Sequence, residues 1–328
     1  MKTYLLTGCA GFIASCVAEE LLRNGHRVVG LDNRNDAYDV ALKDWRLDRL
    51  RTHSEFQFFE RNVANRESFA EFIPLKFDAV IHLAARAGVR YSIRDPWEYV
   101  DTNVTGTLNV LDFCVRADVK KIVLASSSSV YGNSSEPVFH EFQRTDHPVS
   151  PYAATKKAVE VLAYSYHHLY GLDVSVLRFF TVYGPAGRPD MSILRFVHAI
   201  EEGKTFRLYG DGTQQRDFTY CEDIADGVIR ALRPLAEGFD TFNLGGDRPH
   251  SMNFLIDTIS RLSGRAPQIE RRPVHIADVA NTRADIRHAR EILGWEPRVS
   301  LEDGIARTLA WYRENRDWVR NLKTLGGE

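Results

Sequence analysis

A tyrosine and a lysine four residues apart are the first candidates for chemistry in this chain of 328 residues. Tyr152 and Lys156 occur in the stretch SPYAATKKAVE. On a helix, residues four apart lie on one face, so the Lys156 ammonium would lie near the Tyr152 phenol. A nearby cation favours the phenolate, which can act as a general base. The chain has 13 tyrosines, so a chance pair on a solvated helix face is the alternative.

A glycine-rich turn close to the start of the chain predicts a phosphate-binding site. In TGCAGFIA, Gly8, Gly11 and Ala14 recur every three residues between an apolar run and a helical pattern. Glycines allow backbone N–H groups to approach a pyrophosphate, which then faces the positive end of the helix dipole. A purely structural turn is the alternative.

An acidic residue follows at a distance that suits a dinucleotide site. Asp32 ends the next apolar run, in VVGLDN. A carboxylate at this place accepts hydrogen bonds from the adenosine ribose and repels a 2′-phosphate. The combination of turn and carboxylate therefore favours NAD over NADP as the cofactor.

A run of serines gives the tyrosine and lysine their context. Ser127 ends the apolar run 121–127, and Ser128 and Ser129 follow it in ASSSSVYG. Ligands of parallel sheets bind at the carboxyl ends of the strands. We therefore expect these hydroxyl groups beside the cofactor, while a flexible serine loop is the alternative.

The elements that must position these residues alternate between strands and helices. Short runs that are apolar at consecutive positions are typical of strands covered by helices on both faces. Between them, segments such as 11–24 and 102–115 carry apolar residues at helical spacing. The pattern predicts an α/β fold, a doubly wound parallel-sheet Rossmann fold, with a smaller interleaved α/β domain after about Gly184. The predicted strands are 4–7, 27–32, 56–61, 79–84, 121–127 and 174–179.

The composition argues against several classes of function. The net charge is −2 at pH 7 and charged residues of both signs are interspersed, so we expect no nucleic acid partner. No apolar stretch approaches the ~18 residues of a membrane span, and the first one is too short for a signal peptide. The scattered cysteines predict free thiols in a reducing cytoplasm and no metal site. They are Cys9, Cys16, Cys114 and Cys221.

Six motifs occur in the order in which a known family carries them. They are TGCAGFIA, IHLAARAGVR, ASSSSVYG, SPYAATKKA, LRFFTVYGPAGRPDM and RDFTYCEDIADG. With them the chain resembles the extended short-chain dehydrogenase/reductases, specifically the nucleotide-sugar 4-epimerases. It is most similar to UDP-glucuronate 4-epimerases, which carry FFTVYGP-x-GRPDM and a DN-x-ND-x-YD stretch like LDNRNDAYDV here. The resemblance implies a cytoplasmic isomerase with tightly bound NAD, a UDP-sugar substrate, and a homodimer built from the helices around 96–115 and 152–170.

The resemblance also implies roles for individual residues. Tyr152, Lys156 and Ser127 are the expected catalytic residues, with the Tyr152 phenolate taking the proton of the sugar 4-hydroxyl while C4 is oxidised. Cofactor contacts are implied for Gly8, Gly11, Phe12, Ile13, Asp32, Asn33, Asn62, Val63, Leu83, Ala84, Ala85, Asn103, Tyr152, Lys156 and Phe179. Substrate contacts are implied for Arg90, Ser127, Ser128, Ser129, Tyr152, Thr181, Arg188, Arg216 and Asp278. Residues 1–183 would bind NAD and carry the Tyr/Lys pair, and 184–328 would mainly bind the nucleotide sugar, with some segments returning to the first domain.

Arg188, in GPAGRPDM, carries the expectation of a uronate substrate. A guanidinium can hold a carboxylate through two parallel hydrogen bonds, although an ordinary loop arginine is the alternative. Related decarboxylases carry Glu at the position of Ser129, and related dehydratases carry Asp and Glu at the positions of Ser128 and Ser129. Hydroxyl groups cannot supply a carboxylate base at neutral pH, so simple epimerisation is expected.

Three other functions remain as alternatives. Ala186 and Ser129 depart from common family residues near the expected sugar site, so a UDP-glucose/UDP-galactose 4-epimerase is the first. A UDP-glucuronate decarboxylase and a catalytically silent NAD-binding protein are less favoured. A silent protein could dispense with Ser127, Tyr152 and Lys156, yet all three are present.

Overall fold

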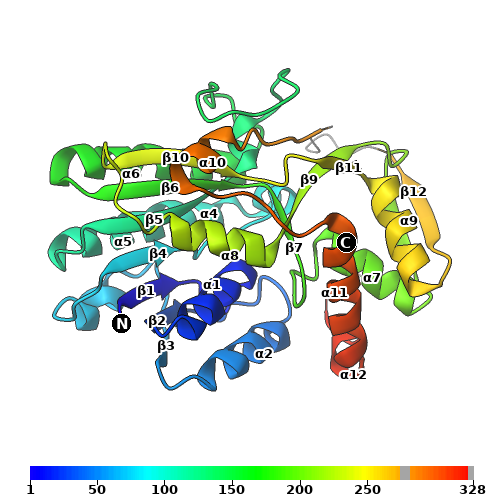
Figure 1. The fold of residues 1–328 in the computed structure, drawn as a ribbon, viewed down its shortest axis with the longest axis horizontal. Helices are drawn as coiled ribbons and strands as arrows, with labels where there is room; N and C mark the ends of the chain where they lie inside the picture. Colours follow the sequence, from blue (N-terminus) through cyan, green and yellow to red (C-terminus); the bar gives the residue numbers. More distant parts are fainter. Residues whose placement is uncertain (274–280, 324–328) are drawn as a thin grey trace.

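The computed structural model describes residues 1–273 and 281–323 and is built on one large parallel sheet. Its seven strands lie in the order β10-β6-β5-β4-β1-β2-β3, so the strand order reverses at β1 and β4 (Figure 1). The predicted doubly wound parallel sheet is confirmed. The strands are β1 (Thr3–Thr7), β2 (Arg27–Asp32), β3 (Phe56–Glu60), β4 (Ala79–His82), β5 (Lys121–Ser127), β6 (Asp173–Phe179) and β10 (Phe239–Leu244).

Alternate residues of the strands enter two separate cores, one on each face of the sheet. Leu6 packs with α1 and α8 on one face, whereas its neighbour Leu5 packs with α5 and α6 on the other. This alternation follows from the two-residue period of a strand, and it explains why the strands are apolar at consecutive positions. The helices and turns around the sheet are α1 (Phe12–Arg23), α2 (Val40–Arg51), η1 (Arg66–Phe72), α3 (Val89–Arg94), α4 (Pro96–Tyr99), η2 (Val100–Thr105), α5 (Gly106–Arg116), η3 (Ser128–Tyr131), α6 (Pro151–Tyr170), α8 (Cys221–Arg230) and α10 (Arg287–Leu293).

One strand of the large sheet was not among those predicted from the sequence. β10 pairs in parallel with β6 at the sheet's edge, although it lies far beyond residue 184. Its sequence FDTFNL mixes polar and apolar residues, so it lacks the continuous apolar run of the inner strands. The buried Asn243 is satisfied there by the Tyr131 phenol, whose hydroxyl it accepts at 2.7 Å.

The remaining elements form a smaller layered unit beside the carboxyl ends of the large sheet (Figure 1). A three-stranded sheet has the order β11-β9-β7, and β12 pairs with β8. A third core, which includes Phe196, Leu255 and Tyr312, joins this unit to α2 and to Phe12 of α1. The elements are β7 (Thr181–Tyr183), α7 (Ser192–Glu201), β8 (Thr205–Tyr209), β9 (Gln215–Tyr220), β11 (Pro249–Ser251), α9 (Met252–Ser263), β12 (Gln268–Arg272), α11 (Leu301–Glu314) and α12 (Arg316–Val319).

The long helix α6 has local signals at both ends. The Ser150 side chain caps it by accepting a hydrogen bond from the Ala153 N–H at 3.1 Å, and Pro151 occupies its first turn. Gly171 ends it in the left-handed conformation that favours glycine. Because these signals fix the start of the helix, they also fix which face carries Tyr152 and Lys156.

Candidate active site

The turn between β1 and α1 has the shape of a phosphate cradle. Gly8 has φ +76°, and a Cβ on it would lie 2.8 Å from the main chain of Ala84. A Cβ on Gly11 would lie 2.8 Å from the Gly8 carbonyl oxygen. α1 starts at Phe12 without a side-chain cap and without an acidic residue in its first turn. Its N-terminal dipole and N–H groups are therefore well suited to a pyrophosphate, so these residues fit the dinucleotide that the sequence predicts.

Asp32 lies at the end of β2 and is oriented from several sides. Its carboxylate accepts hydrogen bonds from the N–H groups of Ala10, at 3.2 Å, and Arg34, at 2.7 Å. Lys43 of α2 places its Nζ 3.6 Å from the same carboxylate, and both side chains are buried. Lys43 also donates to the Asn35 side chain at 3.0 Å. The carboxylate is thus fixed at the place where a ribose hydroxyl would be bound.

The Tyr152 phenol, the Ser127 hydroxyl and the Lys156 ammonium meet at the carboxyl end of β5. Lys156 donates from Nζ to the Ala125 carbonyl at 3.0 Å, and the Ser127 hydroxyl forms a hydrogen bond with the Tyr152 phenol. Ser127 also accepts the Ser129 N–H at 3.1 Å, which holds its side chain in place. The structure therefore brings together the three groups that the sequence placed in one reaction.

Burial shifts the pKa values of Tyr152 and Lys156 in opposite directions. The pKa of Tyr152 is raised by burial, and the Ser127 hydrogen bond and the Arg188 charge offset only part of this rise. Burial lowers the pKa of Lys156 to about 8, against the opposing effect of the Glu160 carboxylate one helical turn further on. Lys156 therefore retains its proton near neutral pH, while the groups that favour the Tyr152 phenolate are Ser127 and Arg188.

Arg188 approaches the Tyr152 phenol from the loop that follows β7. Its Nε and Nη2 bind the Asp190 carboxylate at 3.0 and 2.6 Å, and Nη2 also donates to the Ala87 carbonyl at 3.1 Å. Its guanidinium lies over the Tyr38 ring, 5.9 Å from the ring centre. These contacts hold the Arg188 cation near Tyr152, the phenol that would abstract a proton.

One cavity of about 380 Å³ connects the glycine turn to this cluster. The predicted residues on its wall are Gly8, Gly11, Phe12, Ile13, Asp32, Asn33, Val63, Leu83, Ala84, Ala85, Ser127, Ser128, Ser129, Tyr152, Lys156, Phe179, Thr181 and Arg188. They come from the ends of β1, β2, β4, β5 and β6 and from the following loops. In the described residues no group of three or more His, Cys, Asp or Glu could hold a metal ion.

Four predicted residues lie off this wall, and a fifth is outside the described residues. Asn103 is buried, and its side chain joins the main chain of Arg86 to Thr155. Asn62 caps a turn by accepting the Ala64 N–H. Arg90 lies over the Tyr209 ring at 4.1 Å, and Arg216 donates to the Gln215 carbonyl on β9. Asp278 falls in the segment that is outside the described residues.

Several wall residues were missed by the sequence reasoning. Tyr38, Lys43 and Met191 line the cavity but were not among the predicted site residues. Tyr99 packs edge-on against the Tyr152 ring, with ring centres 6.1 Å apart, and donates to the Gly88 carbonyl at 2.9 Å. Burial raises the pKa of Tyr99 to about 12, so this neighbour remains a neutral donor. The stretch DN-x-ND-x-YD contained Tyr38, and that was the signal that could have drawn attention to it.

Comparisons with known proteins show the family to which the chain belongs. The model of the NAD dependent epimerase/dehydratase family matches residues 4–245. A UDP-glucuronate 4-epimerase of Thermodesulfobacterium geofontis is 52% identical, over 98% of this chain and 100% of that protein. The structure of a UDP-glucuronic acid 4-epimerase from Bacillus cereus, in complex with UDP-glucuronic acid and NAD, is similar with a TM-score of 0.88. The two are 34% identical over 95% of this chain and 99% of that one. A UDP-glucose 4-epimerase of Thermotoga maritima also has a TM-score of 0.88, at 30% identity over 96% and 99% of the two chains.

Proposed function

Because the chain belongs to the NAD dependent epimerase/dehydratase family, as its motifs predicted, we propose that it interconverts UDP-glucuronate and UDP-galacturonate. One observation carries the choice of substrate. The Arg188 cation lies close enough to Tyr152 to lower the pKa of its phenol. The carboxylate of a uronate is attached to C5, next to the C4 that reacts. A cation beside the proton acceptor is therefore where a 4-epimerase of uronates needs one.

The residues that would hold NAD follow from the cavity. Gly8, Gly11 and the start of α1 would bind the pyrophosphate, and Asp32 the adenosine ribose. Lys156 would hold the nicotinamide ribose. When bound, NAD would accept the hydride of C4 and later return that hydride to the same carbon. Since nothing is consumed in a full turnover, we expect the protein to retain NAD from one turnover to the next.

The chain's own residues would remove the proton of the sugar 4-hydroxyl and later return it. Tyr152, as phenolate, takes the proton of the sugar 4-hydroxyl, and Ser127 donates a hydrogen bond to the same sugar oxygen. A 4-keto sugar results. It rotates within the site, so that the opposite face of its C4 is presented to the cofactor. Tyr152 then gives the proton back to the oxygen at C4, and the configuration at this carbon is inverted.

The carboxylate of the uronate must be bound and also kept from leaving as carbon dioxide. A 4-keto uronate is a β-keto acid, which can lose carbon dioxide. We propose that Arg188, with the hydroxyls of Ser128 and Ser129, fixes the carboxylate in an orientation that does not favour this loss. The Asp190 carboxylate now takes two donors of Arg188, so the substrate would bind at Nη1 or displace the exposed Asp190.

The nucleotide half of the substrate would extend toward the smaller unit. We propose that residues 1–183 form the NAD-binding domain and that 184–328 mainly bind the UDP-sugar. β10 is then one of the segments that return to the large sheet. Thr181 lies on the cavity wall, and Arg90 and Arg216 belong to the neighbouring elements, where their charges suit a diphosphate. Asp278 remains a proposed contact.

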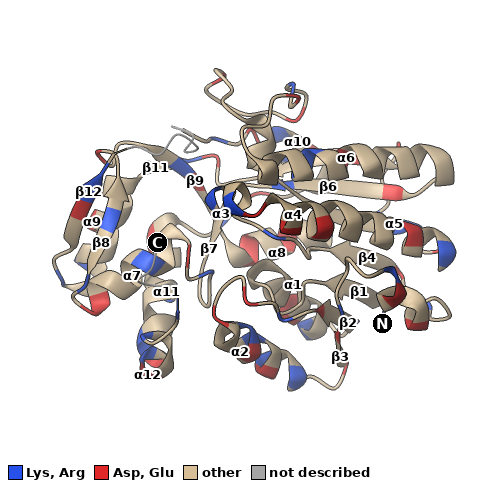
Figure 2. Cartoon of the chain, turned by 180° about the vertical axis from the view of Figure 1, so that it is seen from behind, with Lys and Arg blue, Asp and Glu red and all other residues tan. Residues whose placement is uncertain are grey.

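Exposed apolar side chains support a homodimer. α4, α5 and α6 lie side by side on one face, and α6 is largely free of charged residues there (Figure 2). We propose that two copies pair along this face, burying the side chains in a four-helix interface. Exposed fractions are 77% for Trp97, 40% for Leu108, 55% for Val161 and 67% for Leu169.

The proposed location is the cytoplasm, whose reducing conditions suit the chain's four free cysteines. In the described residues no helix is both long and apolar enough to cross a membrane.

Proton NMR of the purified protein with UDP-glucuronate and no added NAD tests the proposal. We expect galacturonate signals with this substrate and much slower turnover of UDP-glucose under the same conditions. Turnover of UDP-glucose alone would contradict the assignment of Arg188 and favour the UDP-glucose/UDP-galactose alternative. A UDP-pentose product would mean a decarboxylase, and retained NAD without any turnover would mean a silent protein.

A further inference from the structure

An arginine that no motif singled out connects the two halves of the site. Arg46 lies on α2 and is only 2% exposed. Its Nη1 donates to the Ala10 carbonyl at 2.9 Å and to the Tyr38 phenol at 2.6 Å. Its Nε and Nη2 donate to the Ala186 carbonyl at 3.2 and 2.6 Å, and Nη2 also reaches the Gly187 carbonyl at 3.4 Å. These five bonds use all five N–H groups of the guanidinium.

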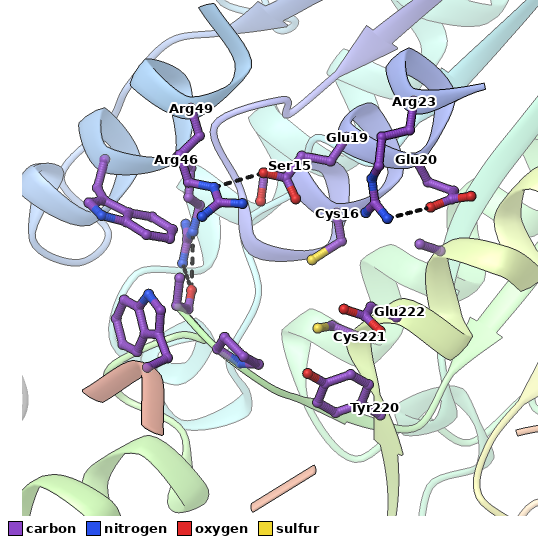
Figure 3. A pocket seen from close by; sticks show the side chains of 15 residues that line it. Ser15, Cys16, Glu19, Glu20, Arg23, Arg46, Arg49, Tyr220, Cys221 and Glu222 are labelled. Carbon is purple, nitrogen blue, oxygen red and sulfur yellow. Dashed lines mark hydrogen bonds and ion pairs between the residues drawn. The ribbon is translucent and has the colours of Figure 1, made fainter. Parts of the chain in front are cut away.

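The position of Arg46 is between two cavities. Ala10 belongs to the glycine turn of the cofactor cavity, whereas Arg46 itself lines a second cavity of about 220 Å³ between α1, α2, α8 and α11. Figure 3 shows this second cavity, with dashed lines from Arg46 to the loop carbonyl. The guanidinium is thus a buried bridge from the cofactor-binding turn to the loop that carries Arg188.

The loop at the far end of this bridge has an unusual backbone. Ala186 has φ +52°, a left-handed conformation that residues with a Cβ seldom adopt. Its carbonyl accepts two of the five bonds from Arg46, which holds this conformation in place. The Tyr38 ring, whose hydroxyl accepts from Arg46, is the ring over which the Arg188 guanidinium lies. Arg46 therefore fixes both the main chain before Arg188 and the ring beneath its side chain.

We propose that Arg46 is a positioning residue for substrate selection, which holds Arg188 where the sugar carboxylate arrives by tying the Ala186 carbonyl to the turn at Ala10. The inference rests on the proposed function. A lysine would not replace Arg46, because its three donors radiate from one nitrogen and cannot reach carbonyls on opposite sides of a planar group. The consequence of losing Arg46 should fall on the uronate and not on a neutral sugar.

Binding without turnover gives the test. In a Tyr152→Phe background loaded with NAD, calorimetry compares the affinities for UDP-glucuronate and UDP-glucose, with and without Arg46→Lys. We expect Arg46→Lys to weaken UDP-glucuronate binding by at least about tenfold, because a misplaced binding group is costly. The affinity for UDP-glucose should change by less than about twofold. A merely structural arginine would instead weaken both ligands together with NAD retention.

Arg49→Lys is the matched control. Arg49 lies on the same helix and lines the same second cavity, but it pairs with Glu19 at 2.8 Å. Its replacement should leave the preference for uronate unchanged. If the parent shows no preference for uronate, both the proposed substrate selection and this inference fail. If the parent shows the preference and Arg46→Lys retains it, only this inference fails.

A milder variant covers the case in which Arg46→Lys does not fold. Tyr38→Phe removes only the hydroxyl that accepts from Arg46 and keeps the ring beneath Arg188. We expect Tyr38→Phe also to lower the preference for UDP-glucuronate, by a smaller factor than Arg46→Lys does. An unchanged preference in the folded Tyr38→Phe protein would overturn the inference.

Discussion

Replacing Ser127 by alanine should move the acid limb of the pH–rate profile. The Ser127 hydroxyl lowers the pKa of Tyr152, whereas burial raises it. A hydrogen bond to a charged group contributes about 1.5–3 kcal/mol, and one pKa unit corresponds to about 1.4 kcal/mol. Loss of this bond should therefore raise the pKa of Tyr152 further and disfavour the phenolate by about 1.5–3 kcal/mol. Because the reaction needs the phenolate, the acid limb of kcat/KM should shift to higher pH.

The alkaline side of the profile limits the remaining activity. Burial lowers the pKa of Lys156 to about 8, so its charge is lost as the pH rises through that value. Since burial already holds the pKa of Tyr152 above its usual value, a further rise in Ser127→Ala leaves fewer molecules that carry both a phenolate and a charged Lys156. We therefore expect a lower maximum of kcat/KM, and not only a displaced profile.

The assay is kcat/KM for UDP-glucuronate from about pH 6 to pH 10. Ser128→Ala is the control, because Ser128 lies on the same wall but is not among the groups that shift the pKa of Tyr152. It should alter KM without moving the acid limb. If Ser127→Ala lowered kcat/KM by one factor at every pH, Ser127 would act on the sugar oxygen alone and this account of the phenol would be refuted.

Three further changes test the cofactor site, the interface and the fold. Asp32→Asn should lower the preference for NAD over NADP by about tenfold or more in reconstitution of apoprotein, since a carboxylate at the end of β2 repels the 2′-phosphate; unchanged selectivity would contradict this. Trp97→Asp should give a monomer in light scattering, and a persistent dimer would exclude this face. The Arg316 pair lowers the pKa of Glu202 to about 2, so its stabilisation is present above about pH 4.5 and lost as the pH falls toward 2. Glu202→Gln should cost about 1–3 kcal/mol in urea unfolding at pH 7 and roughly half of that or less at pH 3, and an equal loss at both would refute the pairing.

The elements that the sequence predicted well are those with local signals. The apolar runs of the inner strands and the turn from Gly8 to Gly11 depend on neighbours in sequence. β10 escaped prediction because it lies at the sheet's edge, contains the buried amide of Asn243 and has no continuous apolar run. Its place beside β6 depends on the path of the whole chain.

The candidate site divides in the same way. Tyr152, Lys156 and Ser127 belong to motifs, and the spacing of four along α6 already placed the first two on one face. Arg46 could not be found in this way, because its partners Ala10 and Ala186 lie 36 and 140 residues away in the sequence. Its contacts are also to main-chain carbonyls, which any residue offers, so the sequence holds no matching side chain to suggest them.

The distribution of acids in the cavity bears on why the reaction should end in epimerisation. Among its wall residues in the described chain, only Asp32 is acidic, and it lies at the ribose end on β2. The acid nearest to Arg188 is Asp190, which is off that wall, and Arg188 lowers its pKa. A carboxylate with a lowered pKa is a poor proton acceptor, and one engaged by a guanidinium is not placed to protonate a leaving group. Elimination of water needs such a group beside the sugar, so Tyr152 is left as the base. A single base that takes the proton of the 4-hydroxyl and returns it to the same oxygen suffices for an epimerisation, in which NAD would accept and return the hydride of C4.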